Sequence, residues 1–295
     1  MYRNLSPAAL GITGRQSEII ELSLSFGFKG IDIDLADFQQ TVKTYGLPHA
    51  RRLLDSARLK LTSFRLPIVW DESDDVYKAG VPALEEALKL ASELGLSRAM
   101  VAISPANDLR PYHENFEFHR RRLQEIGELL TAHKIQLGVE FRASAELRKD
   151  RAFQFIHTLD ALVTLISMIR AANVAAVVDL FEIHASGSSF DDVKKLGKRI
   201  ASVIVADAPA EKSGADCNDD DRMLPAENGA IDLAAVLVTL AEMDYDGPIT
   251  PSVSPENSKG LKREQIVKTA GERLTQAWTT AGLSPAGKLS AALKK

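Results

Sequence analysis

The sequence is poor in cysteine, with Cys217 as the one cysteine among 295 residues. A single cysteine excludes a disulfide within the chain and any zinc cluster that is built from cysteine ligands. Apolar runs long enough for a membrane span, roughly 18 residues, are also lacking, and the N-terminus has no apolar core of a signal peptide. We therefore expect a cytoplasmic protein that has no membrane partner.

Basic residues are not in excess either. Lysine and arginine number 36 against 40 aspartates and glutamates, so the formal net charge is −4. Proteins that bind nucleic acid neutralise its phosphates with a basic surface, so this balance argues against a nucleic-acid partner. The length and a hydrophobic content of 45% suit one α/β barrel, or two smaller domains, with a sizeable core.

Apolar runs alternate with helical patterns along most of the sequence. Strands are predicted at residues 8–12, 30–35, 60–67, 98–105, 135–142, 174–179, 199–207 and 248–253. Helices are predicted at residues 18–26, 46–57, 81–94, 111–133, 152–171, 190–196, 231–243 and 261–281. This rhythm, in units of roughly 35 residues, predicts a single α/β domain, a (β/α)₈ TIM barrel over residues 1–281, with 282–295 as a frayed tail. An open doubly wound sheet is the alternative, but no Gly-x-Gly-x-x-Gly turn follows any strand.

Two of these strands end in an acidic residue. A Val-rich run ends at Asp179, and the strand before it carries Glu140 at its C-terminal end. Such runs suit strands buried on both faces, and barrels of parallel strands gather their catalytic groups at the C-terminal ends. Glu140 and Asp179 are therefore predicted to converge, where they would share one divalent cation or one substrate. An ion cluster with Arg142 or Arg65 is the structural alternative.

A long polar loop, residues 208–230, follows the seventh predicted strand. It contains Cys217, an acidic run at 219–221 and then Arg222. Loops of this length are often functional lids, and a lid must carry contacts to the site that it covers. We expect this loop to fold over the C-terminal mouth of the barrel and to deliver Arg222 to it.

Other charged residues are expected to be structural or solvated. Asp32 and Asp34 alternate with apolar residues, which places them in solvent or in a layer of the barrel, and a position at the barrel mouth is the functional alternative. The basic run of the helix at 111–133 is typical of a solvated helix face. This run consists of Arg120, Arg121 and Arg122, and the histidines on or beside the helix are interpreted in the same way: His113, His119 and His133.

Several segments, taken together and in order, resemble the xylose-isomerase-like sugar isomerase/epimerase superfamily over nearly the whole chain. They read GFKGIDIDL, ALKLASELGLSRAMVAISP, IQLGVEF, AAVVDLFEIHASG, VADAP, DRMLPAENGAIDL and YDGPITPSV. The resemblance implies a TIM barrel with a site at its C-terminal mouth. Because one fold hosts many functions, the site still has to be interpreted residue by residue.

The resemblance implies a divalent cation held by Glu, Asp, His or Gln, and Glu at the ends of strands five to eight. Glu140 matches the first ligand and Asp179 the second. The third position holds Ile204 or Val205 and the fourth holds Ser252, so half of the ligand set is missing. Carboxylates suit Mn²⁺ or Mg²⁺, and two of them alone predict weak binding.

The resemblance also implies groups that hold the substrate. Glu146 has the spacing of one such residue and Arg222 that of another, whereas Glu182 stands in place of the usual histidine and His184 lies two residues later. Further residues could complete the metal site: Glu182, Asp207 and Glu227. For Asp207 a bond to its own loop, and for His184 a place in a loop or the core, are the structural alternatives.

Two functional hypotheses follow. The first is an isomerase or epimerase that moves a proton between adjacent carbons of an open-chain sugar or sugar phosphate, with Glu140 and Glu182 as catalytic residues and with Arg222, Glu146 and His184 on the substrate. The second is a metal-free carbohydrate-binding pseudoenzyme. The endonuclease branch of the superfamily needs histidines at strand ends and a basic face, which this sequence does not offer. Whether the protein forms a homo-oligomer stays open.

Overall fold

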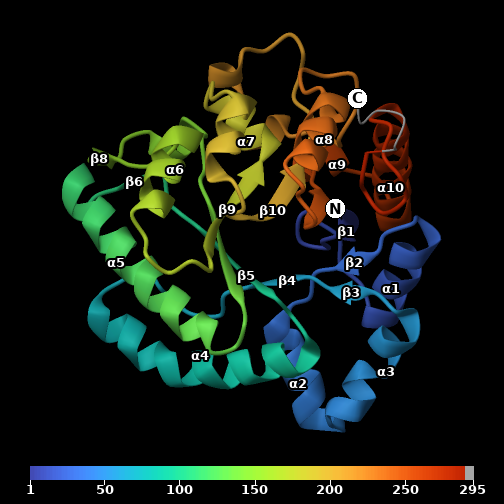
Figure 1. The fold of residues 1–295 in the computed structure, drawn as a ribbon, viewed down its shortest axis with the longest axis horizontal. Coiled ribbons are helices and arrows are strands. Elements are labelled where there is room, and N and C mark those ends of the chain that lie inside the picture. The colour runs from blue at the N-terminus through green and yellow to red at the C-terminus, as the bar shows by residue number, and fades with distance from the viewer. Residues whose placement is uncertain (290–295) are drawn as a thin grey trace.

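A computed structural model describes residues 1–289 and shows helices arranged in a ring around a parallel sheet (Figure 1). The strands follow the order β3-β2-β1-β11-β10-β9-β7-β5-β4, and all of their pairings are parallel. β3 (Lys60–Leu61) pairs with β2 and β4 (Ser63–Arg65) pairs with β5, and only Thr62 separates these two short strands. The sheet therefore closes through one chain segment, and the predicted (β/α)₈ barrel is confirmed.

The other strands of the barrel are β1 (Tyr2–Leu5), β2 (Gly30–Ile31), β5 (Arg98–Ala102), β7 (Gln136–Glu140), β9 (Val174–Asp179), β10 (Ile200–Val205) and β11 (Pro248–Pro251). A separate antiparallel ribbon joins β6 (Ala106–Asn107) to β8 (Phe153–Gln154).

The helices are α1 (Gln16–Ser25), α2 (Leu35–Tyr45), α3 (Leu47–Ala57), α4 (Asp74–Leu94), α5 (Tyr112–Thr131), α6 (Leu159–Ser167), α7 (Leu180–Ala185), α8 (Leu233–Glu242), α9 (Pro255–Ser258) and α10 (Arg263–Thr280). Short 3₁₀ helices are η1 (Glu146–Arg148), η2 (Phe190–Leu196), η3 (Gly214–Asp216) and η4 (Asp219–Asp221). Within residues 1–289, no helix combines the length and the apolar character needed to cross a membrane.

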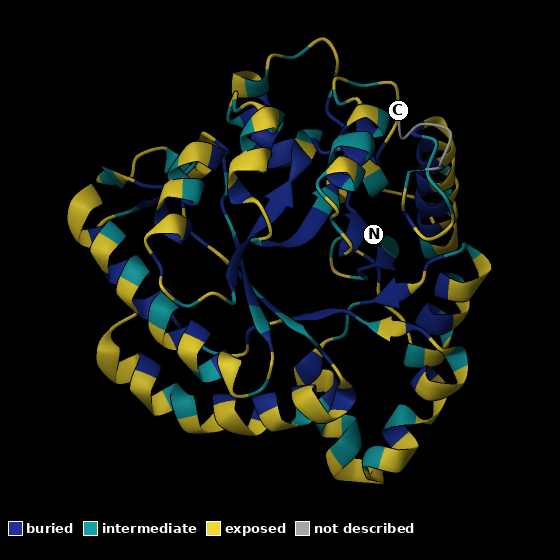
Figure 2. Cartoon of the chain, in the orientation of Figure 1, coloured by how far each residue is buried: buried dark blue, intermediate teal, exposed yellow. Residues whose placement is uncertain are grey.

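Burial explains why the central strands could be recognised. All six residues of β9 are buried, and Figure 2 shows the strands in the buried centre with the exposed residues on the outer helices. The interior is tightly packed at Gly138 of β7, where an added Cβ would lie 2.4 Å from the Met100 sulfur and 3.0 Å from a Val177 methyl. Cores packed to this density resist even one extra carbon.

The predicted first strand at 8–12 is wrong, because β1 lies at Tyr2–Leu5 and residues 7–11 form a turn. β1 was not recognised in the sequence because a polar residue of this strand lies inside the barrel and interrupts its apolar pattern. The Asn4 side chain is buried and donates to Asp32 (3.0 Å) and to Thr250 (3.1 Å). The second strand is also shorter than predicted, since Asp34 accepts from the backbone N–H of Ala36 and thereby caps helix α2, which the sequence analysis missed.

The solvated face predicted for helix α5 is wrong at two positions. Arg122 is 1% exposed, and its guanidinium donates to the Trp70 carbonyl while lying 4.0 Å from the centroid of the Tyr77 ring. His119 is buried, with its Nδ1 2.8 Å from the Asn115 carbonyl oxygen. Burial lowers the pKa of His119 to about 4. Arginine can be buried here because aromatic faces and a carbonyl take the place of water.

Three further boundaries differ from the predictions. α4 begins at Asp74 and not at the predicted residue 81, so Pro82 lies inside the helix. The helix predicted at 152–171 is reduced to α6, and the one predicted at 190–196 is the 3₁₀ helix η2. Before residues 290–295 of the predicted tail, which lie outside the described residues, Leu283 and Leu289 form an antiparallel bridge.

Candidate functional site

Three carboxylates meet at the C-terminal mouth of the barrel. Glu140 ends β7, Asp179 ends β9, and Glu182 lies in the first turn of α7. One carboxylate oxygen from each lies within 4.8 Å of the others. The structure thus brings together Glu140, Asp179 and Glu182, which we call the acidic cluster.

Helix α7 is the element that adds Glu182 to the acidic cluster. Asp179 caps this helix, because its Oδ1 accepts from the N–H groups of Phe181 (2.9 Å) and Glu182 (3.4 Å). The sequence analysis predicted no helix in this segment. An acidic N-cap followed three residues later by glutamate is the signal that could have revealed it.

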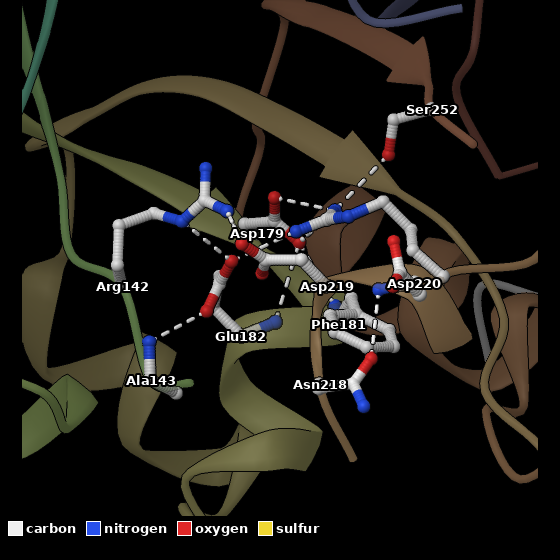
Figure 3. A network of polar contacts seen from close by, with 10 residues as sticks. Arg142, Ala143, Asp179, Phe181, Glu182, Asn218, Asp219, Asp220 and Ser252 are labelled. Carbon is white, nitrogen blue, oxygen red and sulfur yellow. Dashed lines mark hydrogen bonds and ion pairs between the residues drawn. The ribbon is translucent and has the colours of Figure 1, made fainter. Parts of the chain in front are cut away.

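Arg222 enters the acidic cluster from the loop at 208–230. Its Nη1 donates to both oxygens of Asp179 (2.9 and 2.8 Å), and its Nη2 donates to Oε1 of Glu182 (2.8 Å). Nη1 also donates to the hydroxyl of Ser252 on the segment after β11 (3.1 Å), and the guanidinium lies 4.6 Å from the centroid of the Phe181 ring. Figure 3 shows Asp179, Glu182 and Ser252 in this network. The side chain of Arg222 is 10% exposed.

Arg142 is the second arginine that contacts the acidic cluster. Its Nε lies 3.0 Å from Oε1 of Glu182, and its Nη2 donates to Asp219 of η4 (2.6 Å). Oε2 of Glu182 accepts from the N–H of Ala143 (2.6 Å), so both oxygens of this carboxylate are engaged. Arg142 is 31% exposed, compared with 0% for Glu182. The predicted pairing of Glu140 and Asp179 with Arg142 or Arg65 is not found among the described residues, because Arg142 pairs with Glu182 and Asp219 while Asp179 pairs with Arg222.

Glu140 differs from the other two carboxylates. It is half-buried, and its side chain accepts no hydrogen bond from any residue in the described range 1–289. Removal from water, followed by the charge of Asp179, raises the pKa of Glu140 to about 8. Burial and Asp179 likewise raise the pKa of Glu182, against the opposing effect of Arg222 and Arg142. Burial and the charge of Asp179 thus favour the protonated form of Glu140.

The acidic cluster has the spacing of a metal site, but its neighbours fit another cation. Both oxygens of Asp179 and Oε1 of Glu182 already accept hydrogen bonds from Arg222. At the remaining predicted ligand positions, neither Ile204 nor Val205 has a side-chain donor atom, and Ser252 bonds to the same guanidinium. The residues thus fit a guanidinium better than a divalent metal ion.

The structure does not bring Glu146 and His184 into the acidic cluster. Glu146 lies on the exposed η1, 4.0 Å from Lys149, beside a shallow surface hollow that Arg148 and His157 also line. His184 lies in α7, where its Nε2 is buried and has no hydrogen-bond partner within residues 1–289. Neither makes a polar contact with the three carboxylates in the described part of the chain.

Asp207 and Glu227 organise the loop at 208–230. Asp207 is buried and accepts from four backbone N–H groups. These donors belong to Ala208, Glu227, Gly229 and Ile231. The Glu227 carboxylate instead pairs with Arg273 of α10 at 2.8 Å. Asp207 thus makes the bonds to its own loop that the structural alternative predicted.

Asp32 belongs to a separate polar network at the end of β2. It accepts from Ser63 (2.7 Å) and from Asn4 (3.0 Å), and burial raises its pKa. This position corresponds to the barrel layer that the alternating pattern predicted.

A closed parallel barrel with charged side chains at its C-terminal mouth defines an α/β barrel of the TIM type. The sequence profile described as xylose isomerase-like TIM barrel matches residues 20–277. The chain therefore belongs to this family, as the sequence resemblance predicted.

Curated proteins similar to this chain are inosose isomerases. That of Bacillus licheniformis is 28% identical over 151 residues, and the match covers 51% of each chain, so the chain spans about half the length of this relative. That of Bacillus velezensis is 21% identical over 257 residues, which cover 86% of this chain and 88% of the relative.

Solved structures show the same fold. A xylose isomerase domain protein from Alicyclobacillus acidocaldarius has a TM-score of 0.85 at 23% identity, covering 95% of this chain and 99% of its own. The IOLI protein, solved with a binding zinc atom, has a TM-score of 0.79 at 19% identity, covering 96% of this chain and 98% of its own. The zinc atom is a feature of that protein.

Proposed function

We propose that this protein is an isomerase or epimerase that moves a proton between adjacent carbons of a polyhydroxylated carbonyl compound. The substrate class is an inosose, an open-chain sugar or a sugar phosphate. Support for the class comes from the family and from the inosose isomerases among the relatives. The observation that carries the proposal is the state of Glu140, a half-buried carboxyl whose pKa is raised to about 8 and which accepts no hydrogen bond from residues 1–289.

In the proposed reaction, the Glu140 carboxylate takes the proton from the carbon next to the carbonyl group. The electron pair of that C–H bond forms the double bond of an enediolate, and the negative charge moves to the carbonyl oxygen. A proton passes from the hydroxyl on the neighbouring carbon to this oxygen. Glu140 then returns its own proton to the carbon that carried the carbonyl group. The reaction is redox-neutral overall and needs no co-reactant.

Arg142 is proposed to stabilise the oxygen on which negative charge develops. Its guanidinium is 31% exposed beside the acidic cluster, so it can donate to a ligand while Glu182 and Asp219 hold its Nε and Nη2. Fixed donors of this kind stabilise a transition state because they need little reorganisation.

Glu182 is proposed as a positioning residue. It is fully buried and both of its oxygens are engaged, which leaves Glu140 as the carboxyl that contacts the substrate. The sequence analysis predicted Glu182 as a catalytic residue, and the proposal keeps it in the site with this narrower role. Arg222 is treated separately below, because its contacts are with the protein.

The experiment is exchange of carbon-bound hydrogen with D₂O, followed by NMR on an inosose, D-fructose and D-fructose 6-phosphate. The wild type should incorporate deuterium next to the carbonyl group of at least one of them. Glu140→Gln keeps the shape but removes the base, and it should slow exchange by about a hundredfold or more. Glu146→Gln, on the exposed η1, is the matched control and should leave the rate unchanged.

Two outcomes would overturn the proposal. One is equal exchange by the wild type and by Glu140→Gln, which would remove Glu140 from the reaction. The other is tight binding of a sugar without any exchange, which would favour the metal-free carbohydrate-binding pseudoenzyme.

A further inference from the structure

Arg222 binds two of the three carboxylates of the acidic cluster. Its guanidinium bonds to both oxygens of Asp179 and to one oxygen of Glu182, at 2.8–2.9 Å. These contacts join the ends of β9 and α7 to the loop at 208–230. They are charge-assisted hydrogen bonds, which are among the stronger contacts in proteins.

The main chain of Arg222 is fixed as firmly as its side chain. Its carbonyl oxygen accepts from the N–H of Ser254 (2.9 Å) and from the side-chain amide of Asn257 (3.1 Å). Behind the guanidinium lies the face of the Phe181 ring, at 4.6 Å from the centroid. An arginine held at both ends cannot leave the acidic cluster without breaking several contacts together.

A divalent cation would have to displace this guanidinium. Asp179 is 2% exposed and Glu182 is 0% exposed, and both already accept hydrogen bonds from Arg222, so a cation that binds these oxygens competes with the guanidinium. Displacement would leave a buried positive charge without its partners, which is strongly unfavourable. The Ser252 hydroxyl also accepts from Arg222, so the last oxygen ligand on this side is engaged as well.

We infer that Arg222 is a built-in cation that replaces the divalent metal at this site. The guanidinium gives Asp179 and Glu182 one permanent positive charge, and Arg142 adds a second beside Glu182, which keeps the acidic cluster assembled without a metal ion. Within the proposed function, Arg222 is then a positioning residue for Glu182 and Arg142. The activity should also be independent of metal. The inference rests on the proposed function only for that last consequence, because metal affinity can be measured without turnover.

The test is Mn²⁺ binding by calorimetry and by electron paramagnetic resonance, on protein freed of metal with a chelator. The wild type should bind Mn²⁺ weakly. Arg222→Ala frees the oxygens of Asp179 and Glu182, and it should tighten Mn²⁺ binding by about a hundredfold. Arg222→Lys keeps a positive charge in the acidic cluster, and its affinity should stay close to that of the wild type. A purely structural role of Arg222 would not produce a gain in affinity.

Three results would contradict the inference: tight Mn²⁺ binding by the wild type, no gain for a folded Arg222→Ala, or an equal gain for Arg222→Lys. If Arg222→Ala does not fold, the inference is tested instead by the melting temperature of the wild type. It should be the same in excess Mn²⁺ and in chelator, and a clear rise with Mn²⁺ would contradict the inference. None of these readouts depends on Glu140, so failure here is distinguishable from failure of the proposed function.

Discussion

Two glutamates in the same cluster have different chemistry because their contacts differ. Glu182 is enclosed, with Ala143, Arg142 and Arg222 around its two oxygens. Glu140 is half-buried and accepts no hydrogen bond within residues 1–289. Both carboxyls have a raised pKa, owing first to burial and then to Asp179. Only Glu140 combines a raised pKa with access to a ligand.

The raised pKa of Glu140 predicts how activity varies with pH. With its pKa raised to about 8, Glu140 holds its proton below that pH and becomes a base above it. The value of kcat/KM for deuterium exchange should therefore rise with pH and reach half of its maximum near pH 8. The measurement is a profile from about pH 6 to about pH 9. A flat profile, or one that falls as pH rises, would exclude Glu140 as the base.

At the scale of the elements, the loop at 208–230 contributes two charged side chains to the site, Asp219 and Arg222. Asp207 accepts hydrogen bonds from backbone N–H groups of this loop. Asp219 accepts from Arg142, and Arg222 donates to the acidic cluster. Two 3₁₀ helices, η3 and η4, give this long loop its own structure. It lies over the mouth of the barrel, in the place that the sequence predicted for it.

Asp219→Asn tests how this loop is fastened. The change removes the negative charge from the ion pair with Arg142. This ion pair is half-exposed and contributes up to about 1 kcal/mol. We expect limited proteolysis within the loop to accelerate by about twofold to fivefold. Asp191→Asn, which removes the partner of Lys194 on the surface of η2, is the control and should leave cleavage of the loop unchanged. Equal cleavage of the wild type and Asp219→Asn would show that the ion pair does not hold the loop.

At the scale of the whole molecule, the barrel could be predicted because its buried strands are continuous apolar runs. β9 and β7 are examples, and their C-terminal acids identified where the site lies. The prediction failed where polar side chains enter the interior, as Asn4 does in β1, and where a helix is very short, as in α7. Neither case produces the apolar period on which such predictions depend.

The sequence could predict that Glu140, Asp179 and Arg222 meet at the site, but it wrongly added Glu146 and His184, and it could not predict how the residues pair. Glu140, Asp179 and Arg222 follow from strand ends and from the family resemblance. The sequence analysis placed Arg222 on a substrate, whereas its guanidinium bonds to Asp179 and Glu182. That outcome depends on the path of the loop, which contacts with Asp207 and Ser254 determine. Tertiary contacts of this kind leave no local pattern in the sequence.

The most direct test of a metal-free site built around Arg222 and Glu140 is deuterium exchange by the wild type after exhaustive treatment with a chelator. The metal content is measured by emission spectrometry, and exchange is followed on whichever of the three carbonyl compounds reacts. The account predicts that the rate is the same before and after the metal is removed, and that added Mn²⁺ leaves it unchanged. A rate that disappears with the metal and returns with Mn²⁺ would contradict it.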